Sequence, residues 1–138
     1  MTYPNYEHHR VFADITAERA RQIAKWGVQH RADDTGGSHY EEMAELSKQV
    51  CQGAERSTPG GASWRLVLAE EVNEAFAETD PDALCAELTQ VAAVCVAWLE
   101  DIRSRKSARA DAAPSRPLTV GEAIIALVPG AEGAGVKP

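Results

Sequence analysis

The fold is decided by residues 70–90, which read EEVNEAFAETDPDALCAELTQ. Within this stretch Asp80 is a good N-cap and Pro81 a favoured first helical residue, so one helix is predicted to end and another to begin there. Because the connection is short, the two helices are predicted to be antiparallel neighbours. The residues on either side of Asp80 should therefore face one another.

Acidic residues occupy both sides of this corner. Glu74 and Glu87 lie at similar distances from it along the chain, and so at matching heights on the two helices. The same holds for Glu71 and Gln90. Residues three or four apart share a helix face, so Glu74 could bind one ion together with Glu71 or with Glu70. Facing acidic pairs are tolerated only if a cation or a proton lies between them, and oxygen ligands suit Mg²⁺ or Mn²⁺. The sequence thus predicts a divalent metal site.

The rest of the chain also has helical periodicity, and strand signals are nearly absent. The first predicted helix covers about residues 6–26, and the fourth about residues 81–105. The second begins at Ser38 and is ended by residues 57–61, and the third begins at Ser63 and runs to the corner. We expect an all-α protein built as an antiparallel four-helix bundle.

Local signals mark the predicted helix ends. Gly27 is a natural C-cap for the first helix, and Ser63 is a natural N-cap for the third. Ser38, followed three residues later by Glu41, predicts a capping box at the start of the second helix.

Apolar stripes predict which side chains form the core. Residues 91–99 are apolar all round, so the fourth helix is expected to lie centrally and to be covered on several sides. Trp64 and Trp98 lie within apolar stripes and are predicted to be core residues. The stripe of the first helix consists of Phe12, Ile15, Ala20, Ile23 and Trp26.

Composition and charge argue against several classes of partner. The formal net charge of -7 argues against a nucleic-acid partner. The longest apolar run is shorter than the roughly 18–20 residues of a membrane span, so no membrane partner is expected. The three cysteines lack metal-ligand spacing and are predicted to lie in the core. Together with an N-terminus that has no apolar signal core, they predict a reduced, cytoplasmic protein.

The chain is predicted to form one helical domain with a tail. With 138 residues it is long enough for its own core, which we place in residues 1–105. Residues 106–138 are predicted to be a linker and C-terminal tail. Within the tail, residues 118–128 are expected to form a short helix or an arm that packs on another subunit, and residues 129–138 are expected to be mobile.

The acidic residues also have a simpler interpretation, as the solvated surface of an ordinary acidic helix. The matched heights of the two pairs, and the apolar residues beside Glu87, favour the metal site instead. A second string of the same spacing, Glu41, Glu42 and Glu45, lies in the first turn of its helix, where carboxylates complement the helix dipole. No acidic partner follows it across a corner, so a structural role is predicted for it.

The acidic pattern resembles that of a known enzyme family. An EExxE string, followed on the next antiparallel helix by ExxD, is typical of the MazG-like all-α nucleoside triphosphate pyrophosphohydrolases. This chain resembles the family at Glu70, Glu71, Glu74 and Glu87, and the likeness spans about residues 12–105. The resemblance implies Mg²⁺-dependent cleavage between the α and β phosphates, giving a nucleoside monophosphate and pyrophosphate. It also implies a homodimer or a dimer of dimers, in which helices of a partner subunit complete the substrate pocket.

Gln90 departs from the family pattern, which has Asp at this position. An amide oxygen can still coordinate a hard cation, but it adds no charge and cannot act as a base. This favours one alternative, a helical nucleotide-binding or assembly module with little or no turnover. A further alternative keeps the enzyme class and changes the substrate, as in a dUTP diphosphatase or a phosphoribosyl-ATP pyrophosphatase, because related α-helical folds serve those reactions.

The end of the first helix could handle the nucleotide. Arg21 and Lys25 are four residues apart and share a helix face, where they could meet the β and γ phosphates. Trp26 could cover the base, and Gln29 could read its edge. Alternatively, Trp26 caps the core while the cations pair with nearby glutamates. Lys48 on the second helix is a further candidate for binding phosphate.

In the leading hypothesis, Glu71, Glu74 and Glu87 hold one or more Mg²⁺ ions, for which Mn²⁺ can substitute. Gln90 and Glu70 would complete the set of ligands. The ions would polarise the α-phosphoryl group and lower the pKa of a bound water, whose proton Glu70 or Glu71 would accept.

Overall fold

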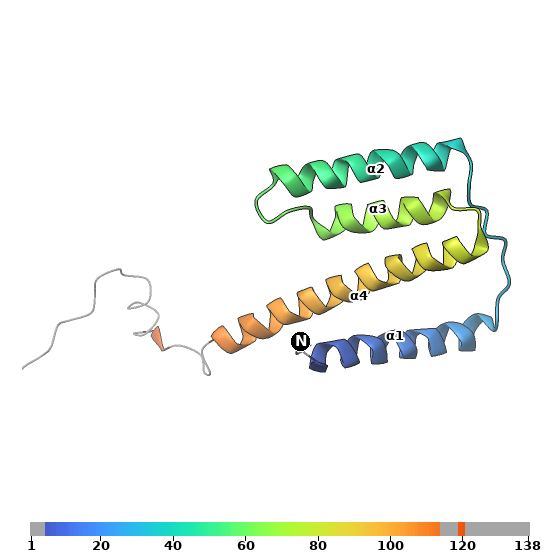
Figure 1. Cartoon of the computed structure of the whole chain (residues 1–138). Coiled ribbons are helices and arrows are strands. Elements are labelled where there is room, and N and C mark those ends of the chain that lie inside the picture. Colours follow the sequence, from blue (N-terminus) through green and yellow to red (C-terminus); the bar gives the residue numbers. More distant parts are fainter. Residues whose placement is uncertain (1–4, 114–118, 121–138) are drawn as a thin grey trace, which may run out of the picture. The chain divides into compact units, whose positions relative to one another are not determined.

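The computed structural model describes residues 5–113 and 119–120. The chain divides into two compact units, Met1–Ser104 and Arg105–Pro138. Helices are the regular elements of the described residues, which contain no strand (Figure 1). They are α1 (Asn5–Trp26), α2 (Ser38–Ser57), α3 (Trp64–Ala77) and α4 (Pro81–Ala112). The prediction of an all-α protein is confirmed.

The corner between α3 and α4 forms as the sequence predicts. α4 begins at Pro81, and the Asp80 carboxylate accepts a 2.9 Å hydrogen bond from the backbone N–H of Ala83. At the start of α3, the Ser63 hydroxyl accepts a 3.4 Å hydrogen bond from the backbone N–H of Leu66. Both caps give a partner to a backbone donor that has none within its own helix.

The capping box predicted for α2 is wrong. Ser38 is the first helical residue, and the N-cap is Gly37, which makes no side-chain cap bond. The φ angle of Gly37 is 102°, a conformation that is open to glycine and strained for serine. The helix therefore begins one residue earlier than a serine N-cap would allow, and the backbone N–H of Glu41 donates to the Gly37 carbonyl.

The loop before α2 is hydrogen-bonded to the end of α3, next to the α3–α4 corner. The backbone N–H of Gly36 donates to the Phe76 carbonyl at 2.8 Å, which gives a partner to an acceptor in the last turn of α3. Gly36 has a φ of 93°, and a Cβ atom there would clash with the methyl group of Thr79. This position therefore requires glycine, and it joins the start of α2 to the corner.

Within the first unit, α1 contacts α4. His8 Nδ1 lies 2.6 Å from a carboxylate oxygen of Glu100, and Arg103 donates to Asp14. The hydrogen bond from Arg103, together with its charge, lowers the pKa of the Asp14 carboxyl. Val11, which lies between the two polar pairs in the α1 sequence, is fully buried.

The stripe predicted to bury α1 is instead largely exposed. The exposed fractions are 47% for Phe12, 37% for Ile15, 47% for Ile23 and 55% for Trp26. A helical period locates the apolar face of a helix, but it does not say which molecule covers that face. Among the described residues, the buried apolar side chains are Val11, Cys51, Ala75, Leu84 and Val96.

α4 also differs from its prediction in coverage and in length. Leu88 and Leu99 are 50% and 38% exposed, so the helix is not covered on all sides. It continues to Ala112 rather than ending near Arg105, because residues 106–112 are rich in alanine, arginine and lysine, which favour helix.

The predicted core residues outside α1 are only partly buried. Trp64 and Trp98 are half-buried, and the Trp64 indole N–H donates to Asp101 at 2.8 Å. Of the cysteines, Cys51 is buried and Cys95 half-buried, whereas Cys85 is exposed. The prediction of three core cysteines is therefore wrong for Cys85.

By length and composition, α4 is apolar enough to cross a membrane, with a mean hydropathy of 1.4 over its best 18-residue window. Of that window, 11% is buried. One such helix is weak evidence for a membrane span, and the expected absence of a membrane partner stays a prediction. The predictions for residues 118–138 lie outside the described residues, apart from Thr119 and Val120.

Candidate metal centre

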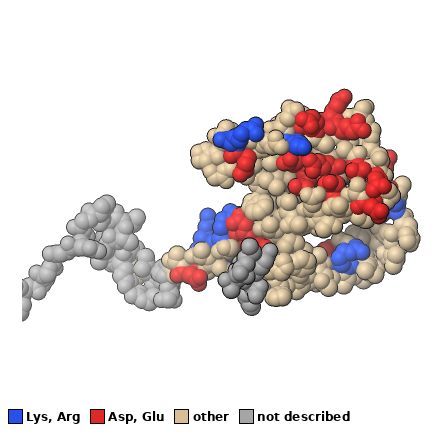
Figure 2. Space-filling model, viewed as in Figure 1, with Lys and Arg blue, Asp and Glu red and all other residues tan. Residues whose placement is uncertain are grey.

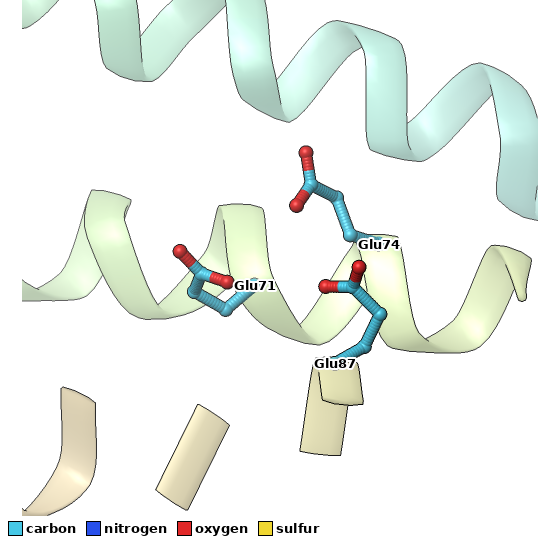
Figure 3. Close-up of side chains that lie close together, drawn as sticks. All are labelled: Glu71, Glu74 and Glu87. Carbon is cyan, nitrogen blue, oxygen red and sulfur yellow. The ribbon is translucent and has the colours of Figure 1, made fainter. Parts of the chain in front are cut away.

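Three carboxylates meet where α3 faces the start of α4. Glu71 and Glu74 come from α3 and Glu87 comes from α4, and one oxygen of each lies within 4.8 Å of the others (Figure 3). We call these three residues the acidic cluster. All three are half-buried, so the fold brings together the carboxylates that the corner is predicted to pair.

Glu71 is the member of the acidic cluster with an unsatisfied atom. Its Oε2 atom is buried and has no hydrogen-bond partner within the part of the chain that the structure describes. Burial, followed by the charges of Glu74, Glu70 and Glu87, raises the pKa of Glu71. A buried acceptor without a partner is unfavourable and calls for an explanation, such as a bound ion.

Glu74 has a similar environment. Burial, followed by the charges of Glu87 and Glu70, raises the pKa of Glu74. The ammonium group of Lys48, on α2, opposes this rise. Lys48 is exposed, so water screens its charge, and the acidic cluster remains a site of uncompensated negative charge.

Glu70 lies beside the acidic cluster and hydrogen-bonds to Cys51 of α2. Burial raises the pKa of the Cys51 thiol to about 11, with further contributions from the hydrogen bond and from the charges of nearby glutamates. The thiol therefore keeps its proton and can donate it to the Glu70 carboxylate. This contact connects Glu70 to α2.

Gln90 lies one turn beyond Glu87 on the exposed side of α4. Its side-chain N–H donates to Oε2 of Glu87 at 3.1 Å. Gln90 therefore adjoins the acidic cluster, but its amide nitrogen, rather than its oxygen, faces the carboxylate. In this arrangement it orients Glu87, and ligation of a cation by Gln90 stays a prediction.

A contact between α2 and the acidic string of α3, residues 70–74, was not predicted from the sequence. The side-chain N–H of Asn73 donates to the Ser47 hydroxyl at 2.5 Å, and both residues are half-buried. The signal was present, because an asparagine in a helix interior needs a polar partner. The identity of that partner could not be predicted, because the hydrophobic period of each helix does not give the register between two packed helices.

Two hollows at the end of α1 share Trp26. The larger, of about 440 Å³, is also lined by Gln29 and by two arginines. The smaller, of about 240 Å³, is lined by Arg21 and Lys25 as well as Trp26. The Lys25 ammonium group lies 4.8 Å from the centroid of the Trp26 ring. Four of the five predicted nucleotide-binding residues thus line these hollows, whereas Lys48 is an exposed residue of α2 that lines neither of them.

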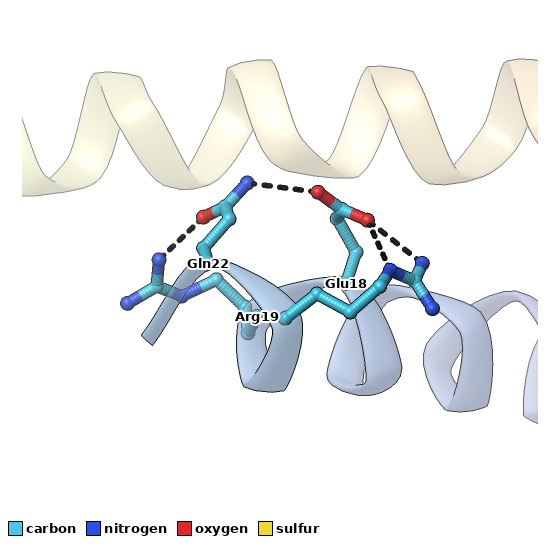
Figure 4. Close-up of polar contacts among 4 residues, drawn as sticks. Glu18, Arg19 and Gln22 are labelled. Atoms are coloured by element: carbon cyan, nitrogen blue, oxygen red, sulfur yellow. Dashed lines mark hydrogen bonds and ion pairs between the residues drawn. The ribbon is translucent and has the colours of Figure 1, made fainter. Parts of the chain in front are cut away.

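The cations at this end of α1 already have partners. Arg21 forms an ion pair with Glu18 at 2.7 Å, and Arg19 donates to Gln22 at 2.5 Å (Figure 4). For Arg21 this agrees with the alternative in which the cations pair with nearby glutamates, whereas Lys25 lies over the Trp26 ring and Trp26, at 55% exposed, does not cap the core. Both members of the Arg21–Glu18 pair are exposed, and such pairs are weak enough for a phosphate group to replace the carboxylate.

The second acidic string, Glu41, Glu42 and Glu45, is exposed along α2. Figure 2 shows acidic side chains over α2, α3 and the start of α4 on one face of the first unit. Within the described residues, the acidic cluster is the one group of His, Cys, Asp or Glu side chains spaced to hold a metal ion. The second string does not form such a group.

No family model, curated protein or solved structure matches this chain. The resemblance to the MazG-like family therefore rests on the acidic residues alone.

The acidic cluster suits a divalent cation by its chemistry. Its donors are carboxylate oxygens, which Mg²⁺ and Mn²⁺ prefer, and the unpartnered Oε2 of Glu71 is an available ligand atom. Burial and then repulsion between the carboxylates raise the pKa values of Glu71 and Glu74, and a bound cation would offset both effects.

Proposed function

We propose that this chain is a Mg²⁺-dependent nucleoside triphosphate pyrophosphohydrolase of the MazG-like type, which produces a nucleoside monophosphate and pyrophosphate. The observation that carries the proposal is the acidic cluster, with three carboxylate oxygens within 4.8 Å and one unpartnered buried oxygen. Carboxylates this close repel one another unless a cation or a proton intervenes.

In this proposal Glu71, Glu74 and Glu87 hold the ion, and Gln90 orients Glu87 through its hydrogen bond. A bound Mg²⁺ or Mn²⁺ ion supplies Lewis acidity to the phosphoryl group and to a water molecule. Glu71 is the first candidate to accept the proton of that water, because it lies within the acidic cluster beside the proposed ion. Glu70 is the second candidate.

The residues at the end of α1 would bind the rest of the nucleotide. Arg21 and Lys25, which line one hollow, would neutralise the pyrophosphate group, and Arg21 would exchange its partner Glu18 for phosphate oxygens. Trp26 is 55% exposed, so its ring is available to cover a base. Gln29 would read the base edge.

We also propose that the chain works as a homodimer or a dimer of dimers. The half-exposed apolar side chains of α1, together with Leu46 and Val50 of α2 at 54% and 47% exposed, support a partner surface. Light scattering is expected to give two or four times the chain mass of 14.9 kDa. A monomer at micromolar concentration would contradict this part of the proposal.

Product analysis tests the reaction. The chain is incubated with each NTP, each dNTP including dUTP, and phosphoribosyl-ATP, in the presence of Mg²⁺, and the products are separated by chromatography. The proposal expects a monophosphate and pyrophosphate, and the substrate panel separates the three possible substrate classes. Release of inorganic phosphate and a nucleoside diphosphate would contradict the proposed cleavage position.

The neutral Gln90 favours a second candidate, a nucleotide-binding or assembly module with little or no turnover. Gln90 contacts Glu87 where the family pattern has a further carboxylate, so the cation would have one fewer charged ligand. Nucleotide binding without product formation under all the conditions above would support this candidate.

A further inference from the structure

Asn73 lies within the acidic string of α3, residues 70–74, but its side chain hydrogen-bonds to α2 rather than to the acidic cluster. Its side-chain N–H donates to the Ser47 hydroxyl at 2.5 Å, across the boundary between α3 and α2. Both side chains are half-buried, so the bond is partly protected from competition by water.

α2 also approaches residues 70–74 of α3 at a second place, where Cys51 hydrogen-bonds to Glu70. The charge of Lys48, also on α2, opposes the raised pKa of Glu74 without forming an ion pair with it. Ser47 and Cys51 are four residues apart, so they share one face of α2. The hydrogen-bonded pairs, in order along α2, are Ser47 with Asn73 and Cys51 with Glu70.

Holding Asn73 fixes the directions of its neighbours on α3. Successive side chains of an α-helix point about 100° apart, so a helix held at one side chain cannot turn freely. While Asn73 is bonded to Ser47, the carboxylates of Glu71 and Glu74 on α3 lie close to that of Glu87 on α4 (Figure 3). Binding sites tolerate a misplacement of only about 0.5 Å or 10–20°.

We propose that Asn73, through its hydrogen bond to Ser47, is a positioning residue for the acidic cluster and holds α3 at the rotation in which three carboxylates share one cation. This inference rests on the proposed role of the acidic cluster as a cation site. A neutral amide fixes the helix without adding a further negative charge beside the cluster.

The test measures Mn²⁺ binding to the full chain, with free Mn²⁺ counted by electron paramagnetic resonance. Asn73→Ala and Ser47→Ala are each expected to weaken binding about 10–100-fold, as the loss of groups that orient metal ligands commonly does. The double variant is expected to bind Mn²⁺ no more weakly than the weaker-binding single variant, because each single substitution already removes the same hydrogen bond. Ser47→Thr keeps the hydroxyl and is expected to retain the parent affinity.

Gln49→Ala is the matched control, because it removes a 2.8 Å hydrogen bond to Glu45 that lies wholly within α2. It is expected to bind Mn²⁺ as the parent does. If Asn73→Ala does not fold, Ser47→Ala removes the same bond and leaves α3 unchanged.

The outcomes separate this inference from the proposed function. Parent affinity in a folded Asn73→Ala or Ser47→Ala chain would overturn the positioning role and leave the metal site standing. A parent chain that binds no Mn²⁺ would overturn both.

Discussion

Glu74 of α3 and Glu87 of α4 lie on either side of Asp80 in the sequence, and an oxygen of one carboxylate lies within 4.8 Å of an oxygen of the other. Figure 3 shows the two side chains, one from each helix. Burial, and then the charge of Glu87, raises the pKa of Glu74. Two ionised carboxylates at this spacing are unfavourable without a cation. In the proposed metal site, protonation and cation binding would therefore compete, which would couple metal affinity to pH and to stability.

Glu74→Gln is expected to weaken Mn²⁺ binding by at least about 100-fold, because changes outside the ligand set alone cost about 10–100-fold. The variant loses one of three charged ligands and keeps the size of the side chain. Titration calorimetry measures the affinity. Glu45→Gln is the control, since it makes the same change in the exposed second string. Equal loss in both variants would show that net charge, rather than the acidic cluster, attracts the ion.

In the metal-free chain, Glu71 and Glu74 are expected to lower stability as the pH rises. Their folded-state pKa values are raised from the ordinary 4.5, so above that value the unfolded chain releases protons before the folded chain does. The free energy of unfolding therefore falls with pH until both groups have ionised in the folded chain, and the loss persists at higher pH.

Urea unfolding of the parent and of the Glu71→Gln, Glu74→Gln double variant, from about pH 4 to pH 8, isolates this contribution. The difference between the two chains cancels the titration of groups that do not interact with these two carboxylates. We expect the variant to gain stability relative to the parent as the pH rises. A difference that does not change with pH would show that these carboxylates are not perturbed.

Trp26→Ala is expected to raise KM for the nucleotide about 5–150-fold, the range that corresponds to losing one base–aromatic stacking contact of about 1–3 kcal/mol. Stability should change little, because the ring is 55% exposed. Trp64→Phe is the control, since Trp64 hydrogen-bonds to Asp101 and lines neither hollow of α1. It should lower stability and leave KM unchanged. The reverse pattern would assign base binding to another surface.

Gln90→Asp is expected to tighten Mg²⁺ binding, because it adds a fourth carboxylate next to the three of the acidic cluster. It also removes the amide hydrogen bond to Glu87, so Gln90→Leu, which removes that bond without adding charge, is the control. Affinity that falls in both variants would mean that orienting Glu87 matters more than the added charge.

The helix ends show what could be predicted from the sequence. Asp80, Pro81 and Ser63 act within one helical turn, so their residue types are sufficient to predict the α3–α4 corner and the start of α3. The capping box at Ser38 failed because the positive φ of Gly37 allows the helix to start earlier. The neighbouring Gly36 donates a hydrogen bond to the Phe76 carbonyl, so a contact between distant parts of the chain adjoins this helix start.

The acidic cluster likewise has one feature that could be predicted from the sequence and one that could not. The meeting of Glu74 and Glu87 could be predicted because both are counted from one corner. The bond between Asn73 and Ser47 could not, because it depends on how α2 is rotated against α3. The exposed stripe of α1 was assigned to the core because periodicity does not distinguish an intramolecular contact from one with a second chain.

The most direct test of the central claim is the initial rate of pyrophosphate release as a function of Mg²⁺ concentration, for the parent, Glu74→Gln and Glu45→Gln. The account predicts no release without Mg²⁺, saturable release in the parent and Glu45→Gln, and loss of release in Glu74→Gln. Equal release by all three proteins, or release that is independent of Mg²⁺, would contradict catalysis at the acidic cluster.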